Sequence, residues 1–213
     1  MNNLPHSSNI EELFNSISHG IMALIAVAGL VLLVYCGVKS SEQYAVLSSV
    51  IYGASLLSLF GASAVYHAVR KAKLKHKFRI LDHANIYLLI AGTYTPVVLL
   101  VVGGVTGWVI FAIQWIMALV GIVLKLFFTG RFEIASVVMY AIMGWMIVFK
   151  IDYLYAELPD TGFWLLVSGG LVYTFGIVFY LFDHKIPFGH FVWHLMVMTG
   201  SALHFLLIAV YVI

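Results

Sequence analysis

Apolar stretches alternate with short polar segments along almost all of the 213 residues. A helix needs about 20 apolar residues to cross a hydrocarbon core about 30 Å thick. Seven stretches meet this requirement, near residues 19–38, 45–69, 80–102, 108–126, 133–150, 162–182 and 190–212. The polar segments between them are too short to fold as separate domains. The pattern predicts an all-α integral membrane protein, with residues 1–213 forming a single seven-helix transmembrane domain.

The composition strengthens this interpretation. Hydrophobic residues make up 63% of the chain and charged residues only 9%, whereas soluble domains carry about 25% charged residues. The single cysteine, Cys36, cannot form a disulfide within the chain. The net charge of +2 is too small for a nucleic-acid-binding protein. Secreted disulfide scaffolds and nucleic acid partners are therefore excluded.

The distribution of lysine and arginine predicts the orientation, because cytoplasmic loops carry the excess of these residues. With the N-terminus inside, the outer side holds only Lys39 and Lys150. The inner side then holds nine basic residues: Arg70, Lys71, Lys73, Lys75, Lys77, Arg79, Lys125, Arg131 and Lys185. We expect a cytoplasmic N-terminus and a C-terminus outside.

The residues before the first predicted span contain no lysine or arginine and include a polar, acidic segment. A cleavable signal peptide begins with basic residues and an early apolar core. We therefore expect the first span to be retained, with residues 1–18 as a tail in front of it.

Four potential ligands are predicted to lie at one depth in the bilayer. His67 ends the second span, Asp82 begins the third, and His190 and His194 begin the seventh. In the predicted orientation all four belong to the cytoplasmic leaflet. Ionisable side chains inside a membrane are costly and usually functional, so their convergence indicates a site.

The spacing of these residues is compatible with zinc chemistry. His190 and His194 are four residues apart and share one helix face, and His67 would add a third nitrogen. Three protein ligands and an open position are typical of catalytic zinc. Asp82 would then orient or deprotonate the bound water, and the Ser63 hydroxyl could hydrogen-bond a water or substrate oxygen. The alternative is a set of polar groups that hydrogen-bond within the bundle, and for Ser63 a small residue at a helix contact.

Other residues have more open interpretations. His19 lies at the same depth and would either reach the site or satisfy a neighbouring helix. His83 is rotated about 100° from Asp82 around the helix, and His204 lies about 15 Å beyond His194, so neither should reach the same ion. Pro96 can kink the third span, which would either open a cavity above the site or serve packing alone.

Several motifs together resemble the hemolysin III family, bacterial members of the progestin and adiponectin receptor group, within a superfamily that includes alkaline ceramidases. The motifs are Ser18-His19-Gly20, Ser63-Ala64-Val65-Tyr66-His67, Leu81-Asp82-His83, Ala91-Gly92-Thr93-Tyr94-Thr95-Pro96 and His190-Phe191-Val192-Trp193-His194. They occur in the family's order and on the expected spans, so the resemblance covers essentially the whole chain.

The resemblance implies a seven-helix bundle in the bacterial inner membrane, with its N-terminus in the cytoplasm. It implies Zn²⁺ bound by His67, His190 and His194. Asp82 would hold the zinc-bound water, with Ser63 beside it. Members of the superfamily are regarded as metal-dependent hydrolases of lipid amide or ester bonds.

Three functions remain open. The first is a zinc-dependent lipid hydrolase or fatty-acid-linked regulator of membrane fluidity, whose partners are membrane lipids or fatty acyl chains. The second is a pore-forming cytolysin, the activity for which founding relatives were named, although no span carries a repeated polar stripe. The third is a lipid sensor that binds acyl chains without turnover.

Overall fold

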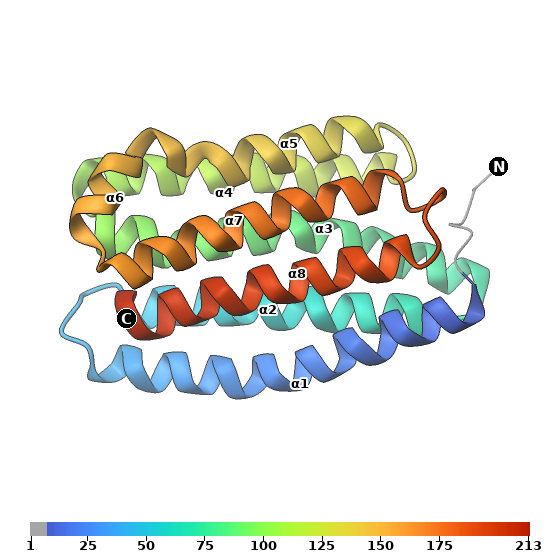
Figure 1. The fold of residues 1–213 in the computed structure, drawn as a ribbon, viewed down its shortest axis with the longest axis horizontal. Coiled ribbons are helices and arrows are strands. Elements are labelled where there is room, and N and C mark those ends of the chain that lie inside the picture. Colours follow the sequence, from blue (N-terminus) through green and yellow to red (C-terminus); the bar gives the residue numbers. More distant parts are fainter. Residues whose placement is uncertain (1–7) are drawn as a thin grey trace.

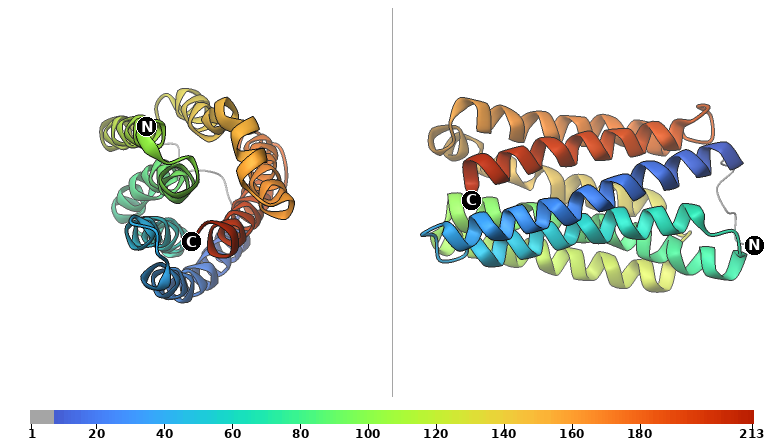
Figure 2. Two further views of the ribbon diagram at one scale, coloured as in Figure 1. Left: turned by 90° about the vertical axis from the view of Figure 1, so that its left-hand side faces the viewer. Right: turned by 90° about the horizontal axis from the view of Figure 1, so that it is seen from below.

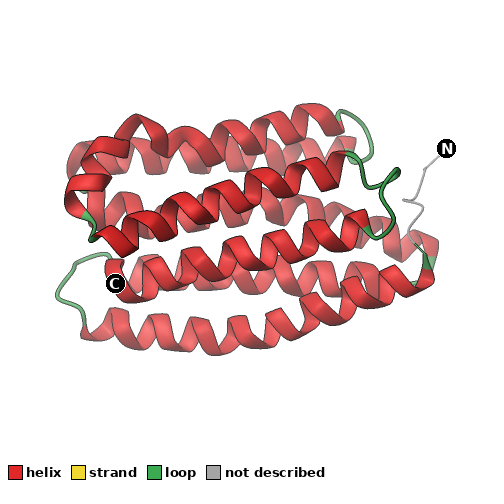
Figure 3. Ribbon diagram, viewed as in Figure 1, coloured by secondary structure: helices red, strands yellow, loops and turns green. Residues whose placement is uncertain are grey.

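The computed structural model describes residues 8–213, so the first seven residues of the predicted tail lie outside the described part. The described elements are α1 Asn9–Lys39, α2 Ala45–Ala68, α3 Ala72–Pro96, η1 Val97–Val102, α4 Gly104–Phe128, α5 Glu133–Trp145, η2 Met146–Lys150, α6 Ile151–Glu157, α7 Asp160–Leu181, α8 Gly189–Leu207 and η3 Ile208–Val212. Between residues 8 and 213 there is no β-strand, as Figure 3 shows.

These elements form seven helical segments that are long and apolar enough to cross a membrane. The segments α3–η1, α5–η2–α6 and α8–η3 each act as one continuous span, and the other four spans are single helices. The predicted all-α, seven-span architecture is confirmed. The fold does not establish which end faces the cytoplasm, so the orientation stays a prediction.

Three helices extend beyond the spans predicted for them. α1 begins at Asn9, ten residues before the predicted first span; α3 begins at Ala72, inside the predicted basic loop; and the fifth span continues to Glu157. The charges in these turns lower local hydropathy, but charged residues do not end a helix when they find partners. Ser8 caps α1 by accepting a hydrogen bond from the Glu11 N–H at 3.1 Å.

The helices run back and forth along one axis, with their connections at the two ends (Figure 1). Seen end-on, they form a ring in chain order, which α8 closes against α1 and α7 (Figure 2). The C-terminal end of α2 and the N-terminal ends of α1, α3 and α8 lie at the same end of the bundle. The fold therefore gathers all four predicted site positions at that end.

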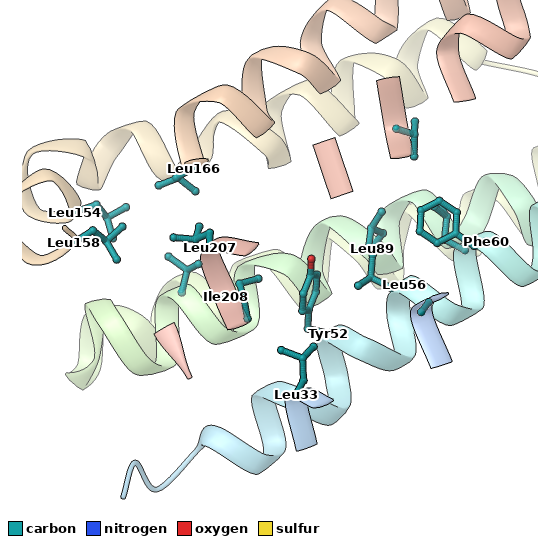
Figure 4. Close-up of a cluster of buried hydrophobic side chains, with 14 of the residues drawn as sticks. Leu33, Tyr52, Leu56, Phe60, Leu89, Leu154, Leu158, Leu166, Leu207 and Ile208 are labelled. Carbon is teal, nitrogen blue, oxygen red and sulfur yellow. The ribbon is translucent and has the colours of Figure 1, made fainter. Parts of the chain in front are cut away.

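The main apolar core lies between α1, α2, α3, α7 and α8 and extends to the opposite end of the bundle. Figure 4 shows Leu33 of α1, Tyr52 and Phe60 of α2, Leu89 of α3 and Leu207 of α8 in this cluster. Burial of such side chains stabilises the bundle through close packing, since lipid tails are as apolar as leucine.

Pro96 changes the helix type of the third span. α3 ends at Pro96, and the chain continues as the π-helical segment η1. The Thr95 hydroxyl donates to the Ala91 carbonyl oxygen at 2.8 Å, one residue before the Gly92 carbonyl that loses its helical N–H donor at the proline. Tyr94 and Val97, on either side of this change, line an apolar cavity.

Candidate metal centre

Three buried histidines from two helices converge at one end of the bundle. His67 lies in the last turn of α2, and His190 and His194 lie in the first two turns of α8. One nitrogen from each ring lies within 4.8 Å of those of the other two. This is the set predicted from depth and spacing, and it could hold a metal ion.

The nitrogens of this set are left available by their surroundings. The Nδ1 atom of His67 faces a carboxylate, whereas Nε2 of His67 and Nδ1 of His194 are buried without a hydrogen-bond partner among residues 8–213. A buried polar atom without a partner is costly unless a ligand completes it. Three imidazole nitrogens with room for a further ligand suit Zn²⁺, which binds His nitrogen at about 2.0–2.1 Å.

Two carboxylates contact the histidines, and sequence reasoning identified neither. Glu12 Oε2 lies 3.2 Å from His67 Nδ1, and Asp183 Oδ2 lies 3.3 Å from His190 Nδ1. The Lys75 ammonium donates to the same Glu12 oxygen at 2.5 Å. Glu12 had been assigned to a polar tail; that assignment was wrong, because the residue is 6% exposed within α1. A signal was present, since Glu12 precedes His19 by seven residues and therefore shares its helix face.

Asp82 and Ser63 line a small cavity of about 30 Å³ together with His19, His190 and His194. Ser63 is 2% exposed, whereas Asp82 is partly exposed. The cavity has room for about one or two waters by the usual measure. The structure thus places both residues beside the histidines, and their catalytic roles stay predictions.

His19 belongs to the same cluster. Its ring stacks on that of His194 with a centroid separation of 3.8 Å and an interplanar angle of 15°. It also meets Phe60 edge-on at 5.2 Å. Of the two interpretations left open by the sequence, contact with the site is therefore the one observed.

His83 and His204 lie outside the ligand set, as expected, although His83 also lines the small cavity. His83 Nδ1 lies 3.6 Å from Glu133 Oε2, on the side of α3 that faces α4 and α5. His204 Nε2 contacts the Leu166 carbonyl oxygen of α7 at 3.1 Å. Neither belongs to the converging set.

A larger cavity of about 170 Å³ adjoins the small one, deeper in the bundle. The two cavities share the side chains of Leu59, Ile86, Trp193 and Val197 as lining. The larger cavity is almost entirely apolar, and η1, α5 and α7 contribute to its walls. A small cavity lined by His19, His190 and His194 therefore lies next to an apolar space.

Comparison with known proteins agrees with this arrangement. A family model described as "Haemolysin-III related" matches residues 7–205. The chain belongs to the hemolysin III family. The match includes the three spans that carry His67, Asp82, His190 and His194, so the family assignment and the observed cluster concern the same part of the chain.

The hemolysin III relatives cover most of the chain. "Hemolysin-3" of Bacillus cereus is 43% identical over 95% of this chain and 92% of the relative. "Hemolysin-3 homolog" of Bacillus subtilis (strain 168) is 40% identical over 94% of each. "Monocyte to macrophage differentiation factor" of Homo sapiens is 31% identical over 92% of this chain and 82% of the relative. No solved structure is significantly similar to the chain.

Proposed function

We propose that this hemolysin III protein is a zinc-dependent hydrolase that cleaves an amide or ester bond of an acyl-chain lipid from within the bilayer. The observation that carries the proposal is the position of the buried histidine set beside an apolar cavity. The small cavity lined by His190 and His194 shares four lining residues with that apolar cavity. Charged or polar groups at membrane depth are most often functional. An acyl lipid matches both parts of the site, since its carbonyl group suits the histidines and its acyl chain suits the apolar cavity.

The substrate would lie across the boundary between the two cavities. Its carbonyl group would lie at His190 and His194, and its acyl chain would occupy the apolar cavity between α3, α5, α7 and α8. Trp193 and Val197 line both cavities and would contact the chain next to the carbonyl. Most of the binding energy would come from contacts of the acyl chain with the apolar cavity. The polar residues around the carbonyl group would determine which bond is cleaved.

The residues of the small cavity would have different roles in hydrolysis. Zn²⁺ bound to three imidazoles supplies a Lewis acid that polarises a carbonyl and activates water. Asp82 would orient the attacking water and accept its proton. Ser63, whose hydroxyl is buried at the same cavity, would donate a hydrogen bond to the carbonyl oxygen as negative charge develops there.

We further propose that the protein resides in a bacterial plasma membrane with the N-terminus in the cytoplasm. The nine basic residues assigned to the end that carries the site support this orientation. The site would then act on lipids of the cytoplasmic leaflet, and the released fatty acid would link its activity to membrane composition. The proposed reaction therefore includes the binding of acyl chains, both in the lipid substrate and in the fatty acid product.

Hydrolysis can be tested without knowing the substrate. Zinc-loaded protein in nanodiscs made from a total bacterial lipid extract would be incubated in H₂¹⁸O. Mass spectrometry would then detect ¹⁸O in the carboxyl group of released fatty acids. We expect label with the wild-type protein, and only background label with His190→Ala/His194→Ala and with the chelator-treated protein.

The same material separates the alternative functions. Acyl chains that co-purify with the protein but acquire no ¹⁸O would contradict the hydrolase and favour a sensor. Leakage of dye from protein-containing liposomes, undiminished in the double variant, would favour a pore-forming protein and contradict the proposal.

A further inference from the structure

In two of the three histidines, a carboxylate contacts Nδ1 and so fixes the orientation of the ring. His67 Nδ1 faces Glu12 Oε2 at 3.2 Å, and His190 Nδ1 faces Asp183 Oδ2 at 3.3 Å. A carboxylate only accepts hydrogen bonds, so each Nδ1 must carry the proton. The lone pair of each neutral ring then resides on Nε2. In His67 this Nε2 is buried and lacks a partner within residues 8–213.

We propose that Glu12 and Asp183 are positioning residues of the metal centre, each holding the Nδ1–H of one histidine so that its Nε2 faces the ion. The proposal rests on the metal site of the proposed function and adds two residues to it. Carboxylates in this role orient the ring, select its tautomer and make the ligating nitrogen more basic. They act through the histidines and do not touch the substrate.

Contacts with α2, α3 and α8 fix Glu12 and the neighbouring residues of α1 in place. Lys75 donates to Glu12 Oε2 at 2.5 Å and lies over the ring of Tyr66 with a centroid distance of 4.8 Å. Glu11 Oε1 accepts from the Phe191 N–H of α8 at 3.4 Å. Phe14 packs against Phe191 with a ring separation of 5.6 Å. The first turns of α1 are thus attached to the helices that carry the ligands.

Asp183 is held by a tight turn between α7 and α8. A Cβ atom on Gly189 would lie 2.9 Å from the Asp183 Cα, so glycine lets the turn pack against the first residue of α8. The Asp183 side chain is 28% exposed, and its other oxygen lies 3.9 Å from His184 Nδ1. Because water competes at this partly exposed carboxylate, Asp183 should contribute less than the buried Glu12.

The third histidine differs from the other two. His194 has no carboxylate partner among the described residues and stacks instead on His19. Its orientation therefore depends on ring packing and on its place in α8. Removing a carboxylate should therefore weaken metal binding only through His67 or His190, and not through His194.

The test measures Zn²⁺ affinity by competition with a chromogenic chelator, on full-length protein in nanodiscs. Glu12→Gln keeps the shape of the side chain but removes its charge, and we expect binding weaker by about 10- to 100-fold. Asp183→Asn should lose less. Glu11→Gln is the matched control, since it removes an adjacent buried charge that contacts no ring nitrogen, while the amide oxygen can still accept from the Phe191 N–H. Its zinc affinity should match the wild type.

A purely structural role would give a different pattern. The thermal midpoint of each protein in EDTA reports the fold without metal. For Glu12→Gln it should stay within about 4 °C of the wild type, because Lys75 is partly exposed and keeps its contacts with the Tyr66 ring and carbonyl oxygen. ¹⁵N NMR of histidine-labelled, metal-free protein should show protonated Nδ1 for His67 and His190, assigned with the single His→Gln variants.

Several outcomes would overturn the inference. Wild-type zinc affinity in both Glu12→Gln and Asp183→Asn would do so, as would an equal loss in Glu11→Gln, or protonated Nε2 in both rings. If Glu12→Gln does not fold, Asp183→Asn decides, because its carboxylate lies in a turn outside the helices. If wild-type protein binds no zinc, the proposed function itself fails, which is a separate result.

Discussion

Two glutamate–lysine pairs, each with one buried and one partly exposed partner, lie on opposite sides of α3 and illustrate different uses of charge in a membrane. In the first, Glu12 pairs with Lys75 at 2.5 Å and contacts His67. In the second, Glu133 pairs with Lys125 at 2.6 Å and also contacts Arg79 at 3.7 Å. Both pairs join helices at their ends, and both include a histidine contact.

The difference lies in the groups around each pair. The Glu133 cluster contains one imidazole, His83, and its charged groups contact one another. Around Glu12, imidazoles from α1, α2 and α8 converge, and several of their nitrogens have no partner within the described residues. A buried ion pair alone is weak evidence for a site. Convergence of unsatisfied ligand atoms is what distinguishes the metal centre.

The largest expected effect is loss of the metal itself. His190→Ala/His194→Ala removes two of the three ligands, so bound zinc should fall from about one ion per chain to none. Elemental analysis of purified protein would measure this. His204→Ala is the control, since His204 lies outside the set. Equal zinc in the double variant and the wild type would place the ion elsewhere.

The second comparison concerns stability in the Glu133 cluster. Glu133→Gln leaves Lys125, which is 2% exposed, without its carboxylate. Breaking a buried pair from one side costs about 3 kcal/mol or more. Lys125→Met should cost less, because Glu133 keeps its contact with Arg79. Reversible unfolding in mixed micelles would measure both.

Zinc affinity should be unchanged in both of these variants. A fall in zinc affinity with Glu133→Gln, measured under conditions where the protein is folded, would mean that the two clusters are coupled. The distinction drawn between them would then be wrong.

A third prediction separates acyl-chain binding from metal binding. Val197 is buried and lines both cavities, so Val197→Phe would place extra volume where the chain must enter. We expect affinity for a fluorescent fatty acid to fall by about 10-fold, roughly 1.4 kcal/mol, with zinc binding retained. Val210→Phe, at a position on η3 that is 63% exposed, serves as the control. Equal fatty-acid affinity in Val197→Phe and wild type would argue against this cavity.

The smallest effect is expected for Ser63→Ala. The change removes a buried hydroxyl beside the histidines without touching a ligand. Zinc affinity should stay within about 2-fold of wild type, whereas ¹⁸O incorporation into fatty acid should fall by about 5-fold, as for loss of one neutral hydrogen bond worth about 1 kcal/mol. An unchanged rate would assign Ser63 to helix packing.

Much of the fold could be predicted from the chain because lipid imposes a simple rule. Every backbone group in the hydrocarbon must be satisfied within its own helix, so seven apolar stretches mean seven helices. Helix ends follow no such rule. α1 and α3 continue through charged residues because Glu12 and Lys75 neutralise each other there, a contact between residues 63 positions apart.

The site was predictable only in part for the same reason. Depth along each span placed His67, Asp82, His190 and His194 at one level, and helix spacing put His190 and His194 on one face. Which other groups touch them depends on how the helices are rotated about their axes. Hydropathy does not report that rotation, so Glu12 and the stacking of His19 on His194 were not foreseen.

The sequence by itself therefore determined the number of spans and the depth of each polar side chain, because both follow from hydrophobic length and a rise of about 1.5 Å per residue. The tertiary structure alone decided which polar atoms meet. Asp183 reaches His190 through a turn that has no periodicity, and the apolar cavity arises where η1 and several helices, among them α2, α3, α5, α7 and α8, pack imperfectly. Contacts of this kind depend on side-chain packing between helices, which a linear pattern of apolar and polar residues does not encode.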